Sequence, residues 1–258
     1  IKMKLLELFS GTHSIGKVCE EKGIDVVSLD RDLPEYDIRD KTKAYKSKHH
    51  IKADIMKWDY KKDFNPGDFD IISASPVCSL WSQLRKSWIN AYYNPTTMKF
   101  KRKPQEGFIK FTPQVLQDDI DKYGKPMVDK VLEIIDYFKP KYWWIENPKS
   151  SSMKDYLFEK VLKENRIVSY CKYGFSYQKH TRIWSNFEFE NKICNNDCDM
   201  MVEIDNKKFH LSNCGNQKCE RRTRKHLKNS NQIGGGGNPY TRYRLPPPLV
   251  NQLLECCV

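Results

Sequence analysis

Short apolar runs alternate along the chain with small-residue or charged turns, and the first run is followed by a helical pattern. Apolar runs of this length predict strands that are buried on both faces, as parallel strands are. A helix is predicted from Ile15 to Lys22, and Gly23 ends it. The predicted strands are Lys4–Phe9, Ile24–Leu29, His50–Ile55, Phe69–Ile72, Tyr142–Ile145, Arg166–Cys171 and Ile183–Trp184. This order of strands and helices predicts an α/β fold.

Two further helices complete the pattern. An amphipathic helix is predicted within Val115–Phe138, where apolar residues recur at helical spacing and Pro140 follows. A last short helix, Leu249–Cys256, follows three prolines, and we expect it to pack back on the sheet.

Residues 80–112 follow neither pattern, because aromatic and basic side chains interleave there with little periodicity. This composition predicts a loop that covers a substrate and contacts phosphates. The alternative is a solvated loop whose aromatic side chains fill in the core.

Two reactive side chains follow predicted strands. Cys78 comes after Phe69–Ile72 and a small-residue turn, and Glu146 comes directly after Tyr142–Ile145. The carboxyl ends of parallel strands meet at one edge, where ligands of open α/β sheets bind. A nucleophilic Cys78 is one interpretation, and a buried structural cysteine is the other. Glu146, beside much apolar surface, is expected to hold a proton more readily than usual; the alternative is an exposed carboxylate that caps the helix beginning near Ser151.

The first strand, turn and helix suit a nucleoside ligand. A small-residue turn, Ser10–Ser14, follows the first strand, and Asp30 lies about 20 residues later, where an acid can bind ribose hydroxyls. The turn lacks the GxGxxG pattern, which disfavours a dinucleotide. Asp54 ends another strand and is placed either to contact an adenine amino group or to cap the turn that follows.

Charge and cysteine content narrow the class of protein. The 258 residues include 45 Lys+Arg and 33 Asp+Glu, a net charge of +12. This excess favours a polyanionic partner, nucleic acid first, although a merely basic protein has the same charge. No apolar run approaches the roughly 20 residues that span a bilayer, and we expect no membrane partner. Nine cysteines without a secretory signal indicate a reducing, intracellular compartment.

Residues 190–238 are polar and rich in cysteine. Cys194 and Cys198, followed by His210 and Cys214, predict four ligands for a structural zinc ion. Cys219 and His226 are rival ligands, and free surface cysteines are the alternative to any metal.

Together these segments resemble the DNA (cytosine-5)-methyltransferases. The matching segments are Leu8-Phe9-Ser10-Gly11, Asp30, Asp54, Ser75-Pro76-Val77-Cys78, Glu146-Asn147-Pro148 and Gln178 to Arg182. They follow the family's order over residues 4–187, and the compact size is most similar to its small viral and phage members. The resemblance implies a Rossmann-like S-adenosylmethionine-dependent methyltransferase sheet with a small Cys-rich recognition insert. It also implies the host cytoplasm or nucleus if the protein is viral.

The resemblance also implies roles for individual residues. Cys78 would attack C6 of a flipped cytosine, Glu146 would hold N3 and the exocyclic amine, and Arg182 would hold O2. The residues implied for S-adenosylmethionine binding are Phe9, Ser10, Gly11, Thr12, His13, Ser14, Asp30, Arg31, Asp54, Ile55 and Ser75. Those expected to contact nucleic acid are Ser82, Arg85, Lys86, His180, Arg221, Arg222 and Arg224.

The chain departs from the family at Val77, Ser79, Pro148 and His180, where the family has proline, glutamine, valine and arginine. Most of the long target-recognition region is also missing. We therefore expect a catalytic domain (1–188), a Cys-rich and basic recognition insert (189–238) and a C-terminal helix (239–258). The expected partner is double-stranded DNA, bound by a monomer. The alternatives are a tRNA cytosine-5 methyltransferase and a catalytically degenerate DNA-binding homologue.

Overall fold

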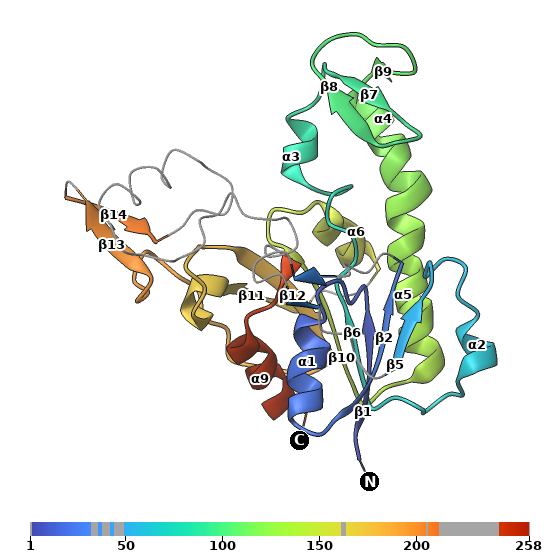
Figure 1. Cartoon of the computed structure of the whole chain (residues 1–258), viewed down its shortest axis with the longest axis vertical. Helices are drawn as coiled ribbons and strands as arrows, with labels where there is room; N and C mark the ends of the chain where they lie inside the picture. The colour runs from blue at the N-terminus through green and yellow to red at the C-terminus, as the bar shows by residue number, and fades with distance from the viewer. Residues whose placement is uncertain are drawn as a thin grey trace.

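The computed structural model of the chain describes residues 2–31, 36–37, 42–43, 49–160, 164–204, 206–211 and 243–257. A seven-stranded sheet runs through its centre in the order β11-β12-β10-β6-β1-β2-β5 (Figure 1). The strands are β1 (Lys4–Leu8), β2 (Asp25–Asp30), β5 (His49–Lys52), β6 (Ile71–Ala74), β10 (Tyr142–Pro148), β11 (Asn165–Ser169) and β12 (His180–Ser185). β12 is antiparallel to both of its neighbours, whereas β5, β2, β1, β6 and β10 are parallel. The expected Rossmann-like α/β fold is confirmed.

β10 is longer than the sequence predicted. The apolar run ends at Ile145, but the strand continues through Glu146, Asn147 and Pro148. It does so because β12 pairs with this extension, with Asn147 opposite Arg182. The two segments of the sequence that carry Glu146 and the Gln178–Arg182 motif therefore lie on adjacent strands.

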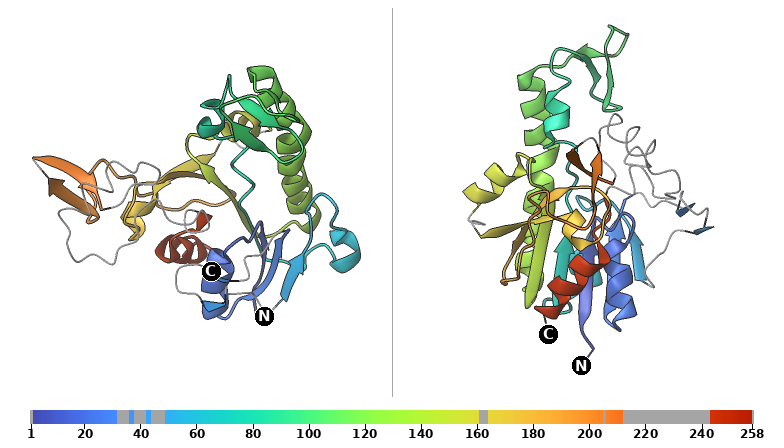
Figure 2. Two further views of the ribbon diagram at one scale, coloured as in Figure 1. Left: turned by 45° about the horizontal axis from the view of Figure 1, so that its top comes forward. Right: turned by 90° about the vertical axis from the view of Figure 1, so that its left-hand side faces the viewer.

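Helices cover both faces of the sheet (Figure 2). α1 (Ser14–Glu21) and α9 (Pro247–Glu255) share one apolar cluster with Leu5, Ile71 and Trp144. α5 (Lys125–Phe138) packs on the other face with Leu6, Ile72 and Trp184. The other helices of the described residues are α2 (Tyr60–Asp63), α3 (Gln83–Lys86), α4 (Pro113–Asp119), the π-helix η1 (Ile120–Gly124), α6 (Met153–Glu159) and the 3-10 helix η2 (Tyr170–Tyr173). The amphipathic pattern within Val115–Phe138 thus covers α4, η1 and α5.

The expectation of a loop at 80–112 is wrong. Residues 83–119 form a small folded unit, here named the aromatic lobe, which stands above the carboxyl edge of the sheet (Figure 1). Its three antiparallel strands are β7 (Tyr92–Asn94), β8 (Lys99–Lys101) and β9 (Ile109–Lys110), in the order β8-β7-β9. Tyr93 and Phe111 are completely buried against Phe100. The lobe's aromatic side chains build its core, so the local lack of periodicity concealed a packed unit.

Arg85, expected to contact nucleic acid, lies inside this lobe. Its guanidinium forms an ion pair with Asp119 and donates to the Tyr93 hydroxyl at 3.0 Å. It also lies over the rings of Tyr93, Phe100 and Phe111. With 7% of the residue exposed, Arg85 is a structural cation and is not available to a phosphate.

α4, η1 and α5 follow one another without a break and connect the lobe to the sheet. At the end of η1, a Cβ on Gly124 would lie 2.9 Å from Cζ2 of Trp81. Contacts this short require glycine, because neither the helix backbone nor a buried indole ring moves easily. Trp81 follows Cys78 by three residues, so this packing also fixes the chain after the cysteine.

Besides the sheet of the aromatic lobe, two short hairpins lie outside the central sheet in the described residues. β3 (Tyr36–Asp37) pairs with β4 (Thr42–Lys43), and β13 (Met201–Ile204) pairs with β14 (Lys207–His210). The second hairpin lies at the β11 end of the molecule (Figure 1).

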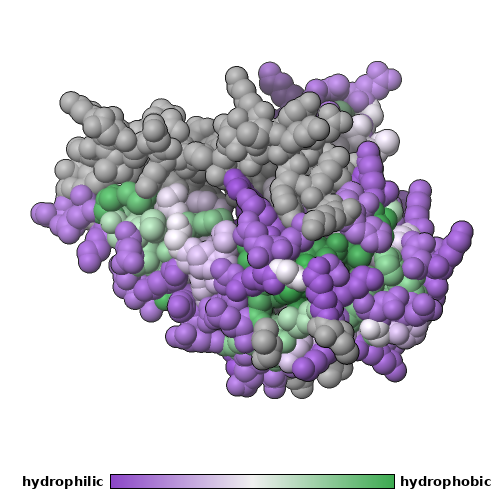
Figure 3. Space-filling model, turned by 60° about the horizontal axis from the view of Figure 1, so that its bottom comes forward, coloured by the Kyte–Doolittle hydropathy of each residue, from purple (hydrophilic) through white to green (hydrophobic). Residues whose placement is uncertain are grey.

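In the part of the chain that the structure describes, no helix is long and apolar enough to cross a membrane. Hydrophilic side chains cover most of the described surface seen in Figure 3, with hydrophobic residues in separate areas between them.

Candidate active site

A cavity of about 640 Å³ opens at the carboxyl edge of the sheet. It lies where the strand order reverses: β2 and β5 are on one side of β1, and β6 and β10 are on the other. The loops that leave β1 and β6 diverge at this point, which is where ligands of open α/β sheets bind. Residues after β1, β2, β5 and β6 line the cavity, together with Glu146 and Pro148 of β10.

The turn after β1 forms one wall. Phe9, Gly11 and His13 have φ values of 59°, 47° and 54°, in the left-handed region. For the two residues other than glycine this conformation costs about 1–3 kcal/mol each. Hydrogen bonds offset the cost: Ser10 N donates to Leu29 O at 3.1 Å, and Gly11 N donates to Asp30 Oδ2 at 2.8 Å. This sharp turn brings the first residues of α1, Ser14 and Ile15, to the cavity.

The turn that carries Cys78 forms the opposite wall, and both neighbouring strands hold it. Ser75 N donates to Leu8 O at 3.3 Å, and the buried Asn147 side chain donates from Nδ2 to Pro76 O at 2.9 Å. Trp81 N closes the turn by donating to Cys78 O at 3.1 Å. Asn147 therefore links the strand of Glu146 directly to the turn of Cys78.

Glu146 and Cys78 face the same cavity, and burial acts on both. Burial raises the pKa of Glu146, whereas the charge of Lys179 and the nearby hydroxyl groups of Ser75 and Tyr170 lower it. Burial also raises the pKa of the Cys78 thiol, and Lys179 opposes that shift while Glu146 adds to it. Among the described residues, none forms a hydrogen bond with the buried Oε2 of Glu146. This carboxyl thus favours its proton, as expected from its apolar surroundings, and has an oxygen free for a ligand.

A comparison with known sequences identifies the family. The chain is 31% identical to the probable DNA (cytosine-5)-methyltransferase of Frog virus 3 (isolate Goorha). The match extends over 269 aligned positions, 99% of this chain and 100% of the viral protein. The chain belongs to the DNA (cytosine-5)-methyltransferase family. It is thus an S-adenosylmethionine-dependent methyltransferase, and the resemblance drawn from its motifs is confirmed.

Solved structures of methyltransferases are more distant. A putative DNA modification methyltransferase encoded within an Escherichia coli prophage is 12% identical, with a TM-score of 0.44 over 75% of this chain. Dnmt2 of Schizosaccharomyces pombe is 16% identical, with a TM-score of 0.42 over 75% of the chain. The chain covers 52% of each of these two proteins, so it spans about half their length. No protein-family model matches the chain.

The residues expected to bind the methyltransferase's cofactor all line the cavity, except His13. His13 is buried behind the turn, with Nδ1 3.6 Å from Glu7 Oε2. Asp54 lines the cavity and also accepts a hydrogen bond from Met56 N at 3.0 Å, so it caps the following turn as well. Sequence reasoning missed Tyr243 and Leu245, which complete the wall beside α1; Leu245 N donates to Ser14 Oγ at 3.1 Å.

Lys179, which sequence reasoning also missed, is a cation of the cavity wall, whereas Arg182 is not part of that wall. The Arg182 guanidinium donates to Asn165 Oδ1 and lies 5.7 Å from the centre of the Phe158 ring, against α6. Both residues belong to the same short motif, and Lys179 directly precedes β12. The positive charge of Lys179 within the motif could have marked it as a candidate. The sequence does not reveal, however, whether Lys179 or Arg182 faces the cavity.

The residues expected to contact nucleic acid lie in several places. Ser82 accepts a hydrogen bond from Leu84 N at 3.1 Å and so caps α3, and Lys86 is exposed beside it. His180 Nδ1 lies 2.8 Å from Ser169 Oγ at the start of β12. Arg221, Arg222 and Arg224 lie outside the described residues.

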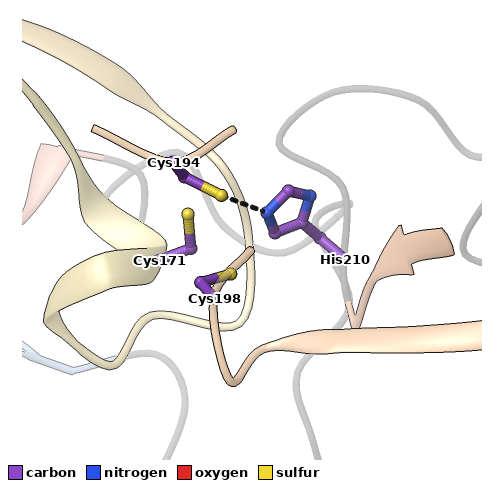
Figure 4. A group of neighbouring side chains, drawn as sticks. All are labelled: Cys171, Cys194, Cys198 and His210. Carbon is purple, nitrogen blue, oxygen red and sulfur yellow. Dashed lines mark hydrogen bonds between the residues drawn. The ribbon is translucent and has the colours of Figure 1, made fainter. Parts of the chain in front are cut away.

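Three of the expected metal ligands come together: Cys194, Cys198 and His210. Cys214 lies outside the described residues. A residue that sequence reasoning missed, Cys171 of η2, joins the three (Figure 4). Its spacing from Cys194 gave no local signal, because the whole of β12 lies between them.

Proposed function

We propose that the chain transfers a methyl group from S-adenosylmethionine to C5 of cytosine in DNA, through a covalent bond between Cys78 and C6 of a flipped base. One observation supports this most directly: Cys78 and Glu146 share a single cavity with the turn after β1, with Asp30 at the end of β2 and with Asp54 after β5. A nucleophile, a proton-holding carboxyl and a nucleoside site are thus within reach of one another.

The cavity suits the cofactor. Its volume of about 640 Å³ lies within the range of roughly 300–1,000 Å³ for small-molecule sites. Asp30 would accept hydrogen bonds from the ribose hydroxyls, and Asp54 would accept one from the adenine amine. The start of α1 would face the cofactor's carboxylate. When bound, S-adenosylmethionine supplies an electrophilic methyl group on its sulfonium.

Cys78 supplies the electrons that cytosine C5 lacks. Its thiolate would bond to C6, which makes C5 nucleophilic enough to take the methyl group. Transfer of the C5 proton to a base would then break the Sγ–C6 bond and restore the aromatic ring. Burial opposes ionisation of this thiol, whereas the positive charge of Lys179 favours it. Lys179 would therefore help to generate the thiolate inside a partly dry cavity.

Glu146 would recognise the cytosine ring. A carboxyl with a raised pKa can donate its proton to N3, and its other oxygen can accept from the exocyclic amine. These contacts stabilise the charge that develops in the ring as Cys78 adds. Lys179, whose charge acts on both Cys78 and Glu146, would supply the positive charge near O2 that the family resemblance assigns to Arg182.

The aromatic lobe is a candidate surface for DNA. Its exposed cations are Lys86, Lys99, Lys101, Arg102, Lys103 and Lys110. Arg102 lies 4.3 Å from the centre of the Trp88 ring, and Lys110 lies 5.1 Å from that of Tyr92. Aromatic rings hold these long side chains in place, which lowers the entropy lost on binding phosphates. Met98, in the turn between β7 and β8, lines the cavity itself, so DNA on the lobe would lie beside the site of a flipped base.

The division of the chain extends this proposal. Residues 1–188 and 239–258 would form the catalytic unit. Residues 189–238 would form the recognition insert, with Arg221, Arg222 and Arg224 on phosphates.

Transfer of a labelled methyl group to mixed genomic DNA and, separately, to tRNA tests the reaction and its substrate. We expect 5-methylcytosine in DNA with wild-type protein and with Cys256→Ser, a control at the far end of α9. Cys78→Ser should bind S-adenosylmethionine normally but transfer no label. Label in tRNA alone would establish the RNA alternative. A protein that binds S-adenosylmethionine but labels neither the genomic DNA nor the tRNA would favour the degenerate DNA-binding homologue.

DNA that contains 5-fluorocytosine tests the covalent step. Fluorine at C5 blocks the elimination that releases Cys78, so the complex should survive denaturing electrophoresis. Its loss in Cys78→Ser, but not in Cys256→Ser, would assign the bond to Cys78. Methyl transfer without any trapped complex would contradict the covalent mechanism.

A further inference from the structure

Three thiols and one imidazole cluster outside the cavity, at the β11 end of the sheet (Figure 4). Cys171 comes from η2, Cys194 and Cys198 come from the segment after β12, and His210 ends β14. All four ligand atoms lie within 4.8 Å of one another, and Cys194 Sγ is 3.5 Å from His210 Nε2. Zn–S bonds of about 2.3 Å and Zn–N bonds of about 2.0 Å place tetrahedral ligand atoms roughly 3.5–3.8 Å apart. The cluster has the donor set and the size of a structural zinc site.

Among the described residues around the cluster, few apolar side chains are available to hold the segment in a fixed shape. Its apolar cluster consists of Cys171, Cys194 and Cys198, with Met200 and Met201 packed against them. The three cysteines are free thiols and are at most 8% exposed. Burial of so few apolar side chains does not repay the entropy of ordering a polar segment. A bound metal ion supplies that free energy in small cysteine-rich units.

The surroundings also suit a metal. Three thiolates and one neutral imidazole around Zn²⁺ carry one net negative charge, and Lys172 lies close enough to Cys194 and Cys198 for its own charge to interact with both. Lys172 is held by Asp197, with Nζ 3.0 Å from Oδ1. Cys194 N donates to Ser169 Oγ at 2.9 Å, and that hydroxyl lies 2.8 Å from His180 Nδ1. These outer contacts connect the cluster to the start of β12, as the second shell of a metal site does.

We propose that Cys171, Cys194, Cys198 and His210 bind one Zn²⁺, which fixes the β13–β14 hairpin to the end of β11. Cys171 takes the place that the sequence predicted for Cys214. Cys171 belongs to the segment that leads from β11 into the Gln178–Arg182 motif at the start of β12. The metal would therefore connect the insert to the segment that carries Lys179. This proposal is independent of the methyl acceptor.

Elemental analysis of the full chain, purified without chelator, tests the site. We expect one zinc per chain in wild type and in the control Cys256→Ser, and almost none in Cys171→Ser or Cys198→Ser. Cys214→Ser separates the two ligand sets, because it should retain zinc. A wild-type protein without metal, or loss of zinc in Cys214→Ser together with its retention in Cys171→Ser, would overturn the proposal.

Three further measurements keep the test decisive if a cysteine variant folds poorly. Binding of S-adenosylmethionine reports separately whether the catalytic sheet of each variant is intact. Co²⁺ exchanged into the wild-type protein should give the intense visible absorption of a tetrahedral cobalt–thiolate site, and removal of the metal should lower the unfolding temperature. A weak, octahedral cobalt spectrum, or an unfolding temperature that does not respond to chelator, would contradict the site.

Discussion

The centre of the sheet and its β11 end hold reactive side chains in different ways. At the centre, Leu6, Ile72 and Ile145 are completely buried, and the turns that carry the cavity residues are hydrogen-bonded to those strands. At the β11 end, three cysteines and a histidine converge with hardly any apolar core. The central site is therefore preformed by burial, whereas the outer cluster, under the metal proposal, depends on a bound ion. Substitutions in the core or at charged residues, and removal of the metal, should therefore affect the central site and the outer cluster differently.

The largest expected effect comes from the core. Leu6→Ala removes a completely buried side chain of β1, and such changes cost about 2–5 kcal/mol of the free energy of unfolding. Denaturant unfolding should report this loss with chelator absent or present. Zinc content should stay at the wild-type level, because Leu6 is remote from the cluster. Loss of zinc in this variant would show that the two regions do not form independently.

A smaller effect is expected from the cation of the cavity. Lys179→Met should slow methyl transfer by about 10²-fold, because such a charge stabilises the thiolate and the developing ring charge. Cofactor binding should be unchanged. Arg182→Met is the matched comparison, and we expect a weaker effect on rate since Arg182 packs against α6. Single-turnover rates of the two variants provide the test, and the reverse ranking would assign the catalytic cation to Arg182.

Gly124→Ala should slow transfer by about 10-fold. The added Cβ would meet the Trp81 ring at 2.9 Å, and small displacements of reacting groups carry large rate penalties. The strain itself should cost about 1–3 kcal/mol of stability. Gly23→Ala is a useful control for the substitution, because a Cβ there meets nothing within 4 Å, although its positive φ adds strain of its own. Transfer at the wild-type rate in Gly124→Ala would show that Trp81 does not position Cys78.

The smallest expected effect is a change in how stability depends on pH. Burial raises the pKa of Glu146 in the folded protein, so the folded state holds this proton more tightly than the unfolded state does. The free energy of unfolding should therefore fall as pH rises from the usual carboxyl pKa through the raised one. Glu146→Gln should remove this part of the slope. Equal slopes for the two proteins, measured by denaturant unfolding at several pH values, would mean that burial does not perturb this carboxyl.

The sequence by itself determined the seven strands of the central sheet, most of the helices that cover it and the side chains at the ends of these strands. Apolar periodicity is local, so β1, β2 and β6 could be placed from their own residues. Parallel strands bring their carboxyl ends to one edge, and this rule was enough to expect Cys78, Glu146, Asp30 and Asp54 near one another.

Tertiary structure alone decided which charged and sulfur-containing side chains meet. Arg85 is buried because rings from distant positions close around it, and Lys179 lines the cavity because of how the chain enters β12. Cys171 joins Cys194, Cys198 and His210 because η2 and the β13–β14 hairpin come together at the end of β11. Such encounters depend on packing between segments remote in sequence. No pattern within a single segment encodes them, so the sequence alone determined the elements of the central sheet, and the tertiary structure decided which side chains meet.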